Sequence, residues 1–290
     1  MLLAKTNLSE QIRHGLEEWA GEAHSSRFIT FYLELLEIQA EVEATLAPPV
    51  IKLTREELET RLVSGIPLFN FDEFVLNKPL INATFHRMAG LFASYPDVLG
   101  AVPEQLLDSR FNLSAEAVRN WLTGGELPTE IGGEPINPGL LGSLIQQTLR
   151  PFLIGYSQAM AGRFSQASWR RNLCPICGSE ADFSYLEKEV GGRYLVCATC
   201  CAEWQFQRTQ CPYCGNIDTR TLSYLTNESG LYRLYLCDQC KCYLKAIDLR
   251  KTTETKIPSL ESLTTVSLDR QAQEKGYHRS ERRQEPGNRG

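Results

Sequence analysis

Residues 174–178 read CPICG and residues 211–215 read CPYCG, and each run is followed by a second cysteine pair, CATC at 197–200 and CDQC at 237–240. The interval between the two pairs is 19 residues in the first repeat and 22 in the second. A C-x-x-C turn directs two sulfurs at one ion, and two such turns complete a tetrahedron of thiolates. The pattern therefore predicts an internal duplication with a four-cysteine metal site in each repeat.

The cysteines of the four pairs are the candidate metal ligands: Cys174, Cys177, Cys197, Cys200, Cys211, Cys214, Cys237 and Cys240. Consecutive pairing, with one ion per repeat, follows from the duplication. The alternative is a cross-brace, in which the first pair joins the third and the second joins the fourth. In a reducing compartment, metal explains such pairs better than disulfides. The two cysteines left over, Cys201 and Cys242, are interpreted as packed thiols, with a redox or ligand role beside the metal as the alternative.

Four thiolates suit zinc, and they equally suit a single rubredoxin-like iron. None of the four histidines lies between the first and the last cysteine. Because the protein supplies all four ligands, no coordination position stays open for a hydrolytic water, which argues against a catalytic zinc. The sites are therefore expected to hold the fold or to carry electrons.

Composition and charge limit the other function classes. Residues 1–170 hold 13 Lys and Arg against 20 Asp and Glu, residues 171–250 hold nine of each, and residues 251–290 hold eight against six. An acidic domain beside a neutral cysteine region is a poor match for a phosphate backbone, so no nucleic-acid partner is expected. No apolar run approaches the ~20 residues of a membrane span, and no secretory signal is recognisable, so the expected location is the cytoplasm, without membrane insertion.

The N-terminal part has the sequence features of a helical domain. Helices are predicted where apolar residues recur at a 3.6-residue period and where caps or breakers mark an end. The expected helical segments are 26–46, one that opens at the Thr54 and Glu57 capping box, one that opens at 77–79, 114–122, and 139–169 with a break at Pro151. The segment 127–138 is rich in Pro and Gly and is expected to be a loop. We therefore predict an all-α domain over residues 1–168.

Beyond residue 180 short aromatic and aliphatic runs, 194–196 and 231–236, precede cysteine pairs and predict strands. The predicted fold is α+β: an acidic helical domain followed by two tandem, small rubredoxin- or zinc-ribbon-like modules. The expected boundaries are 1–168 for the helical domain, 169–209 and 210–250 for the modules, and 251–290 for a polar tail with one short helix.

Trp204 and Arg208 follow the second cysteine pair four residues apart. The simplest interpretation has the indole covering the metal cluster and the guanidinium pairing locally. Contact with a partner is the alternative for both residues.

Several runs together resemble one family. They are CPxCG, RYLVCATC at 193–200, EWQFQRTQC at 203–211, CDQCKCYLK at 237–245 and SLDRQAQEKGY at 267–277. This set of motifs resembles that of the formate dehydrogenase accessory proteins of the FdhE type, over roughly residues 170–280. Cys201 departs from the pattern, because a polar or acidic residue is expected at its position.

The resemblance implies a cytoplasmic, chaperone-like maturation protein that is not itself an enzyme. Its partner would be the catalytic subunit of a respiratory formate dehydrogenase, and its two metal ions would be rubredoxin-like iron, with zinc as the alternative. Two other functions stay open: a zinc-ribbon nucleic-acid-binding protein, and a rubredoxin-like redox protein.

Overall fold

A computed structural model describes residues 7–21, 26–69 and 77–280. The described chain forms two compact units: residues 7–49 with 77–156, and residues 50–69 with 157–280. The last ten residues of the expected polar tail lie outside the described residues. The expected boundaries at residues 168, 209 and 250 stay predictions.

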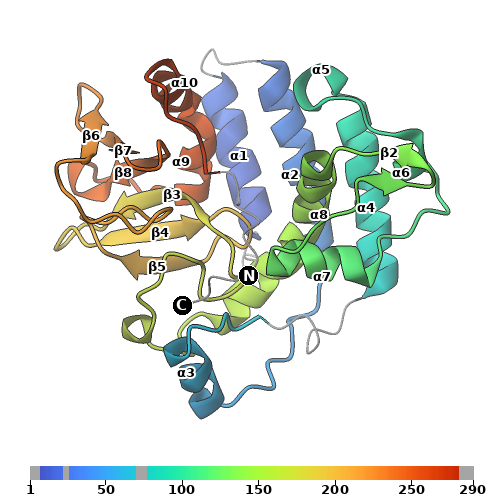
Figure 1. The fold of residues 1–290 in the computed structure, drawn as a ribbon, viewed down its shortest axis with the longest axis horizontal. Helices are drawn as coiled ribbons and strands as arrows, with labels where there is room; N and C mark the ends of the chain where they lie inside the picture. Colours follow the sequence, from blue (N-terminus) through green and yellow to red (C-terminus); the bar gives the residue numbers. More distant parts are fainter. Residues whose placement is uncertain (1–6, 22–25, 70–76, 281–290) are drawn as a thin grey trace, which may run out of the picture. The chain divides into compact units, whose positions relative to one another are not determined.

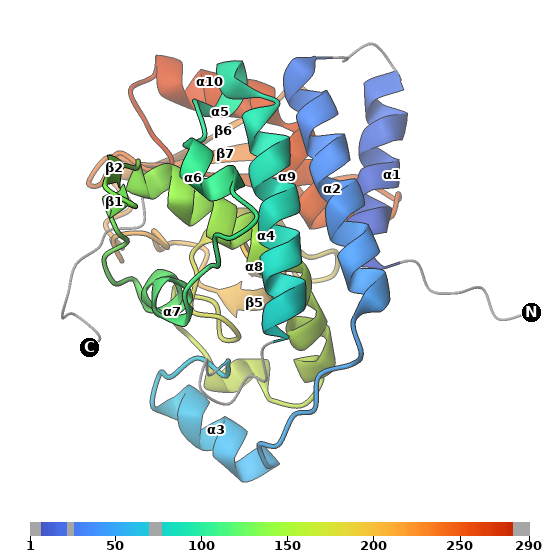
Figure 2. The same cartoon turned by 90° about the vertical axis from the view of Figure 1, so that its right-hand side faces the viewer.

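The first unit is helical, which agrees with the predicted class. Figure 2 shows α1, α2 and α4 running side by side, and the ring of Phe31 on α2 meets Phe92 on α4 edge-on at 5.4 Å between centroids. No helix in the described part of the chain is long and apolar enough to cross a membrane. The elements are α1 Leu8–Gly21, α2 Arg27–Thr45, α4 Lys78–Ala93, α5 Pro96–Leu99, α6 Glu104–Leu107, α7 Ala115–Thr123, β1 Glu130–Ile131, β2 Glu134–Pro135 and α8 Pro138–Met160.

Polar side chains begin these helices where the sequence predicts. Ser26 accepts a hydrogen bond from the backbone N–H of Ile29, and Asn77 and Ser114 cap α4 and α7 in the same way. Gly124 ends α7 in the left-handed conformation. The expected loop 127–138 differs in one respect, because it contains the two-residue strands β1 and β2.

Helix α8 continues through Pro151, so the break predicted there is wrong. Proline has no N–H, which leaves the carbonyl four residues earlier, that of Gln147, without its helical donor. The buried side chain of Gln39 on α2 supplies the missing bond, with 3.1 Å between Nε2 and the Gln147 oxygen. A contact 108 residues away in the sequence thus keeps the helix intact.

The second unit is built on one six-stranded sheet of order β5-β4-β3-β8-β7-β6 (Figure 1). The first repeat contributes the antiparallel strands β3 to β5 and the second contributes β6 to β8. The parallel pair β3 and β8 joins the two repeats. The strand bounds are β3 Ala181–Leu186, β4 Arg193–Cys197, β5 Glu203–Phe206, β6 Leu222–Thr226, β7 Tyr232–Cys237 and β8 Tyr243–Asp248.

The sequence predicted β4 and β7, which carry aromatic and aliphatic residues into a cysteine pair. It missed the other four strands of this sheet. Strand β8 contains Lys245 and Asp248, and β6 is largely exposed, so neither shows the alternation or the apolar run by which strands are recognised.

Helix α3, Arg55–Val63, belongs to the second unit although it lies between α2 and α4 in the sequence. Thr54 and Glu57 form the predicted capping box. The segment after the helix runs along the first cysteine turn, where the N–H groups of Leu68 and Phe69 donate to the carbonyls of Pro175 and Ile176 at 2.8 and 2.7 Å. A stretch distant in sequence therefore supports the first candidate metal site.

The described part of the expected tail is packed against the sheet. It contains two helices, α9 Pro258–Thr264 and α10 Val266–Glu274, where the sequence predicted one. Lys245 of β8 is 1% exposed, and its ammonium donates to the carbonyl oxygen of Ser262 at 2.7 Å and to Asp269 on α10 at 2.7 Å. A cation at the end of α9 satisfies helical carbonyls, which helps to end that helix before α10 begins.

Candidate metal centres

The four cysteine pairs gather in consecutive groups, as the duplication predicts. The Sγ atoms of Cys174, Cys177, Cys197 and Cys200 all lie within 4.8 Å of one another, and so do those of the second repeat, Cys211, Cys214, Cys237 and Cys240. The cross-brace alternative does not match this grouping. All ten cysteines are free of disulfides.

The sulfur spacing fits a tetrahedral ion. Sulfurs placed ~2.3 Å from a central metal are ~3.8 Å apart. The Sγ atoms of Cys174 and Cys200 are 3.6 Å apart and those of Cys177 and Cys197 are 3.5 Å apart. In the second group the corresponding distances, Cys211 to Cys240 and Cys214 to Cys237, are 3.7 and 3.6 Å. Each group therefore has the dimensions of a four-thiolate metal site, and the chain could bind two metal ions.

The two groups differ in exposure. All four cysteines of the first are buried, whereas Cys214 is exposed and Cys240 half-buried in the second. In the first group burial raises the pKa of the Cys174 and Cys200 thiols well above the ordinary value, and hydrogen bonds from the neighbouring sulfurs hold the pKa of Cys177 well below it. A bound cation would replace the protons on Cys174 and Cys200, so metal binding at this group releases protons.

All four turns share one backbone geometry. The residue after the second cysteine has a positive φ in every turn: 75° at Gly178, 55° at Cys201, 74° at Gly215 and 57° at Lys241. In each turn the N–H of the first cysteine donates to the carbonyl of the residue directly after the positive-φ position. Cys174 donates in this way to Ser179 at 2.8 Å, and Cys237 to Cys242 at 3.1 Å. These loops turn N–H groups toward sulfur, for example Thr199 to Cys197 at 3.3 Å.

This geometry gives Cys201 and Cys242 a structural place. Cys201 occupies the position that glycine takes in the CPxCG turns, and Cys242 closes the fourth turn. Sequence reasoning did not see that Cys201 and Lys241 occupy the position that Gly178 and Gly215 take in the other two turns. The signal was present, because each directly follows a C-x-x-C pair.

We expect Cys201→Gly to keep two metals per chain and to raise the free energy of unfolding by up to about 1 kcal/mol, because glycine adopts positive φ without a side-chain penalty. Metal analysis and urea unfolding of the metal-loaded protein measure both effects. Gly178→Ala is the opposite change at the equivalent position, where a Cβ would lie 3.1 Å from Pro67 Cγ, and it should destabilise. Loss of a metal in Cys201→Gly would instead make Cys201 a ligand.

Comparisons with known proteins match this arrangement. The model of the family described as FdhE, central domain, matches residues 173–208. The protein FdhE homolog of Aquifex aeolicus is 28% identical over 268 residues, which cover 89% of this chain and 88% of that protein. The crystal structure of the FdhE protein from Pseudomonas aeruginosa has a TM-score of 0.62 at 21% identity and covers 94% of this chain and 92% of that one. The chain is similar to FdhE proteins over most of its length.

Some relatives match a shorter stretch of this chain. The protein FdhE homolog of Shewanella oneidensis is 33% identical over 110 residues, which cover 37% of this chain and 36% of that protein. The resemblance drawn from the cysteine motifs is confirmed, and the α+β fold agrees with that of the relative's crystal structure. The two expected four-cysteine groups are present in this chain.

The remaining candidate residues lie in different surroundings. Trp204 is fully buried, and its indole N–H donates to the carbonyl of Arg171 at 3.0 Å. Arg208 is exposed and lines a pocket beside the second cysteine group, together with the buried Cys242. Whether any of them contacts a partner stays a prediction, and their positions favour Arg208 over the enclosed Trp204.

Proposed function

We propose that this chain is a formate dehydrogenase accessory protein that acts in the cytoplasm and binds the catalytic subunit of a respiratory formate dehydrogenase during its maturation. It would do so as a scaffold held by two metal ions at the eight paired cysteines, and without catalysing a reaction. The observation that carries the proposal is the similarity to FdhE proteins over nearly the whole chain together with two sulfur tetrahedra of metal-site dimensions.

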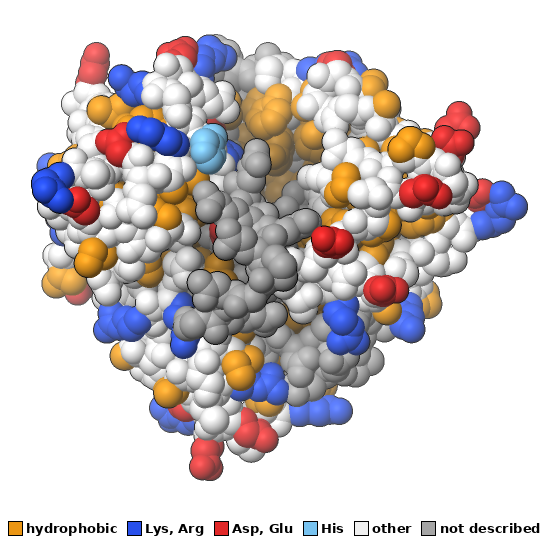
Figure 3. Space-filling view, in the orientation of Figure 1, with side chains coloured by type: hydrophobic (Ala, Val, Ile, Leu, Met, Phe, Trp, Pro, Cys, Tyr) orange, Lys and Arg blue, Asp and Glu red, His pale blue; other side chains and the backbone are white. Residues whose placement is uncertain are grey.

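The charge distribution favours a protein client over nucleic acid. On the face shown in Figure 3, acidic and basic side chains are intermingled. A nucleic-acid-binding surface carries its Lys and Arg on one face or stripe. The chain's net charge of −5 adds to this argument.

The rubredoxin-like redox alternative is favoured by one observation, the exposure of Cys214 at the edge of the second group. A cluster that opens to solvent is accessible to an electron donor, whereas the buried first group is suited to a structural ion. Iron is the metal we favour at both groups. Anaerobic purification followed by metal analysis and a visible spectrum tests this: two irons with absorbance that bleaches on reduction support iron, and two zincs without colour make both sites structural.

In cells that lack the chain, we expect formate dehydrogenase activity to fall to background and the wild-type gene to restore it. A tagged chain should co-purify with the catalytic subunit. The Cys177→Ser variant should restore neither activity nor co-purification, because its scaffold has lost an ion, whereas Cys201→Gly should restore both. Normal formate dehydrogenase activity without the chain, or restored activity without any co-purified subunit, would contradict the proposed role.

A further inference from the structure

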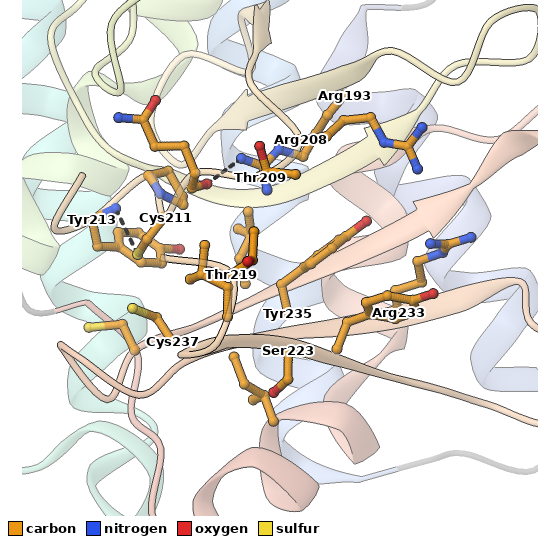
Figure 4. A pocket seen from close by; sticks show the side chains of 17 residues that line it. Arg193, Arg208, Thr209, Cys211, Tyr213, Thr219, Ser223, Arg233, Tyr235 and Cys237 are labelled. Atoms are coloured by element: carbon orange, nitrogen blue, oxygen red, sulfur yellow. Dashed lines mark hydrogen bonds between the residues drawn. The ribbon is translucent and has the colours of Figure 1, made fainter. Parts of the chain in front are cut away.

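A pocket of about 460 Å³ lies beside the second cysteine group, wholly within the second unit. Its walls come from both repeats: Arg193 of β4 and the linker residues 208–213 on one side, and Tyr235 and Arg233 of β7 with the edge strand β6 on the other (Figure 4). This volume falls within the range of small-molecule sites, ~300–1,000 Å³. The described lining includes three arginines and no Asp or Glu.

Two of the arginines are equivalent by the duplication. Arg193 lies four residues before Cys197, and Arg233 lies four residues before Cys237. The curved sheet brings these two positions to opposite walls of one pocket, as Figure 4 shows. The duplication therefore produces a pair of guanidinium groups at a single site.

Arg193 is an enclosed cation without a carboxylate. It is 2% exposed, and its guanidinium donates to the carbonyl oxygens of Gln207 and Gln210 in the linker. Its guanidinium carbon lies 5.3 Å from the ring centre of Phe206 and 5.6 Å from that of Tyr235. Burial lowers the pKa of Arg193 to about 10.

Donors remain unused at this site. Among the described residues, the Nε atoms of Arg193 and Arg233 are buried and have no hydrogen-bond partner. Arg233 and Arg250 share one carboxylate, Asp248, at 2.6 and 2.7 Å, so this trio keeps one positive charge. With Arg193 and the exposed Arg208, the neighbourhood holds about three uncompensated positive charges, which suits a dianion better than a carboxylate.

Much of the remaining lining is aromatic or apolar, and Thr209, Gln210, Thr219 and Ser223 add polar groups. Tyr213, Tyr224 and Tyr235 face the pocket with Leu222, Leu236 and Leu244. Tyr224 is 52% exposed on the edge strand, and the Arg233 guanidinium carbon lies 5.0 Å from the centre of its ring. Tyrosine and arginine both offer flat surfaces on which a planar ring can stack.

We propose that this pocket binds a small organic phosphate that carries a planar ring. The phosphate would take the guanidinium donors of Arg193, Arg208 and Arg233, and the ring would pack against Tyr235 and Tyr224. An acidic peptide would satisfy the charges, but a pocket of this volume with tyrosine walls favours a compact aromatic ligand.

A structural explanation competes with this proposal. Four thiolates around a divalent ion carry a net charge of −2, and Cys211 and Cys237 line the same pocket. The arginines would then balance the cluster and bind nothing else. The two explanations differ in what happens when an arginine is removed. If the arginines only balance the cluster, the metal content changes; if they bind a phosphate, the ligand affinity changes.

The test is calorimetric titration of the metal-loaded full chain at about pH 7.5, where a phosphate monoester is mostly a dianion. Adenosine 5′-monophosphate is compared with adenosine, which has the same ring and no phosphate. We expect the monophosphate to bind at least tenfold more tightly than adenosine. Arg208→Gln should weaken its binding at least tenfold while two metals stay bound, because a charged donor to phosphate is lost.

Arg270→Gln is the matched control, because Arg270 is an exposed arginine on α10 outside the pocket lining. It should bind the monophosphate as the wild type does. Arg193→Lys keeps the positive charge but loses the paired N–H donors of the guanidinium. It should also weaken binding of the monophosphate, provided that its metal content is unchanged. The proposal is overturned if the monophosphate does not bind, if adenosine binds equally well, or if only an acidic peptide binds. It is also overturned if Arg208→Gln has no effect on monophosphate binding, or if the arginine variants only lower the metal content.

Discussion

Replacing Cys177 by serine should remove one metal per chain and leave the second unit without a cooperative unfolding transition. Structural zinc sites contribute ~10–16 kcal/mol of apparent binding free energy, which is comparable with the whole stability of a domain, ~5–15 kcal/mol. Cys177 is buried among three other sulfurs, and a serine hydroxyl does not replace a thiolate ligand. Metal analysis gives the loss, and near-ultraviolet circular dichroism during a urea titration gives the unfolding.

The second group provides a graded comparison. Cys214→Ser should also remove one metal, but it should disturb the fold less because Cys214 is exposed at the edge of its group. Cys201→Ser is the control, since it changes a cysteine beside the first group that is not among the candidate ligands. If Cys177→Ser kept two metals and its full stability, the first group would not be a metal site.

Replacing Asp269 by asparagine should lower the free energy of unfolding by about 3–5 kcal/mol, the usual cost of breaking a buried ion pair from one side. The change leaves the ammonium of Lys245 enclosed without its 2.7 Å carboxylate partner. Asp269 also accepts hydrogen bonds from Tyr243 at 2.7 Å and from Arg279 at 3.0 Å. Urea unfolding of the metal-loaded protein measures the loss.

The double variant Lys245→Met with Asp269→Asn separates the stranded charge from the loss of packing. It should recover part of the stability, because no unpaired ammonium is then left inside the protein. A double variant less stable than Asp269→Asn alone would show that Lys245 stabilises chiefly through its bonds to the carbonyls of α9, at Ser262 and Thr265.

The same network makes the stability of the protein depend on pH in the acid range. Burial works to raise the pKa of the Asp269 carboxyl, but Lys245 and Arg279 outweigh it and hold the pKa below its ordinary value. A carboxyl whose pKa is lowered on folding stabilises fully above the unfolded value of ~3.9, and this contribution is lost as pH falls through the folded value. The wild type should therefore lose more stability than Asp269→Asn on acidification below about pH 4.

Two sequence motifs behind the family resemblance meet in this network. Lys245 ends the run at 237–245, and Asp269 belongs to the run at 267–277. The sequence showed both runs but not that they form one ion pair, because 24 residues separate them. The polar composition of residues 251–280 led to the prediction that they belong to a polar tail. Four polar residues of this stretch, Glu261, Ser262, Thr265 and Asp269, are in fact buried against the sheet.

The sequence by itself determined the features that depend on local geometry. A C-x-x-C turn places two sulfurs over only four residues, so the eight candidate ligands follow from spacing, and the duplication favoured their consecutive grouping over a cross-brace. The caps at Ser26, Thr54, Asn77 and Ser114 act within one helical turn and were equally visible. The tertiary structure decided what depends on distant contacts: the support of α8 at Pro151, the place of α3 beside the first cysteine group, and the parallel joining of β3 to β8. That joining brings Arg193 and Arg233 to one pocket, and no local pattern could show it, because the physical cause is hydrogen bonding between strands about 60 residues apart.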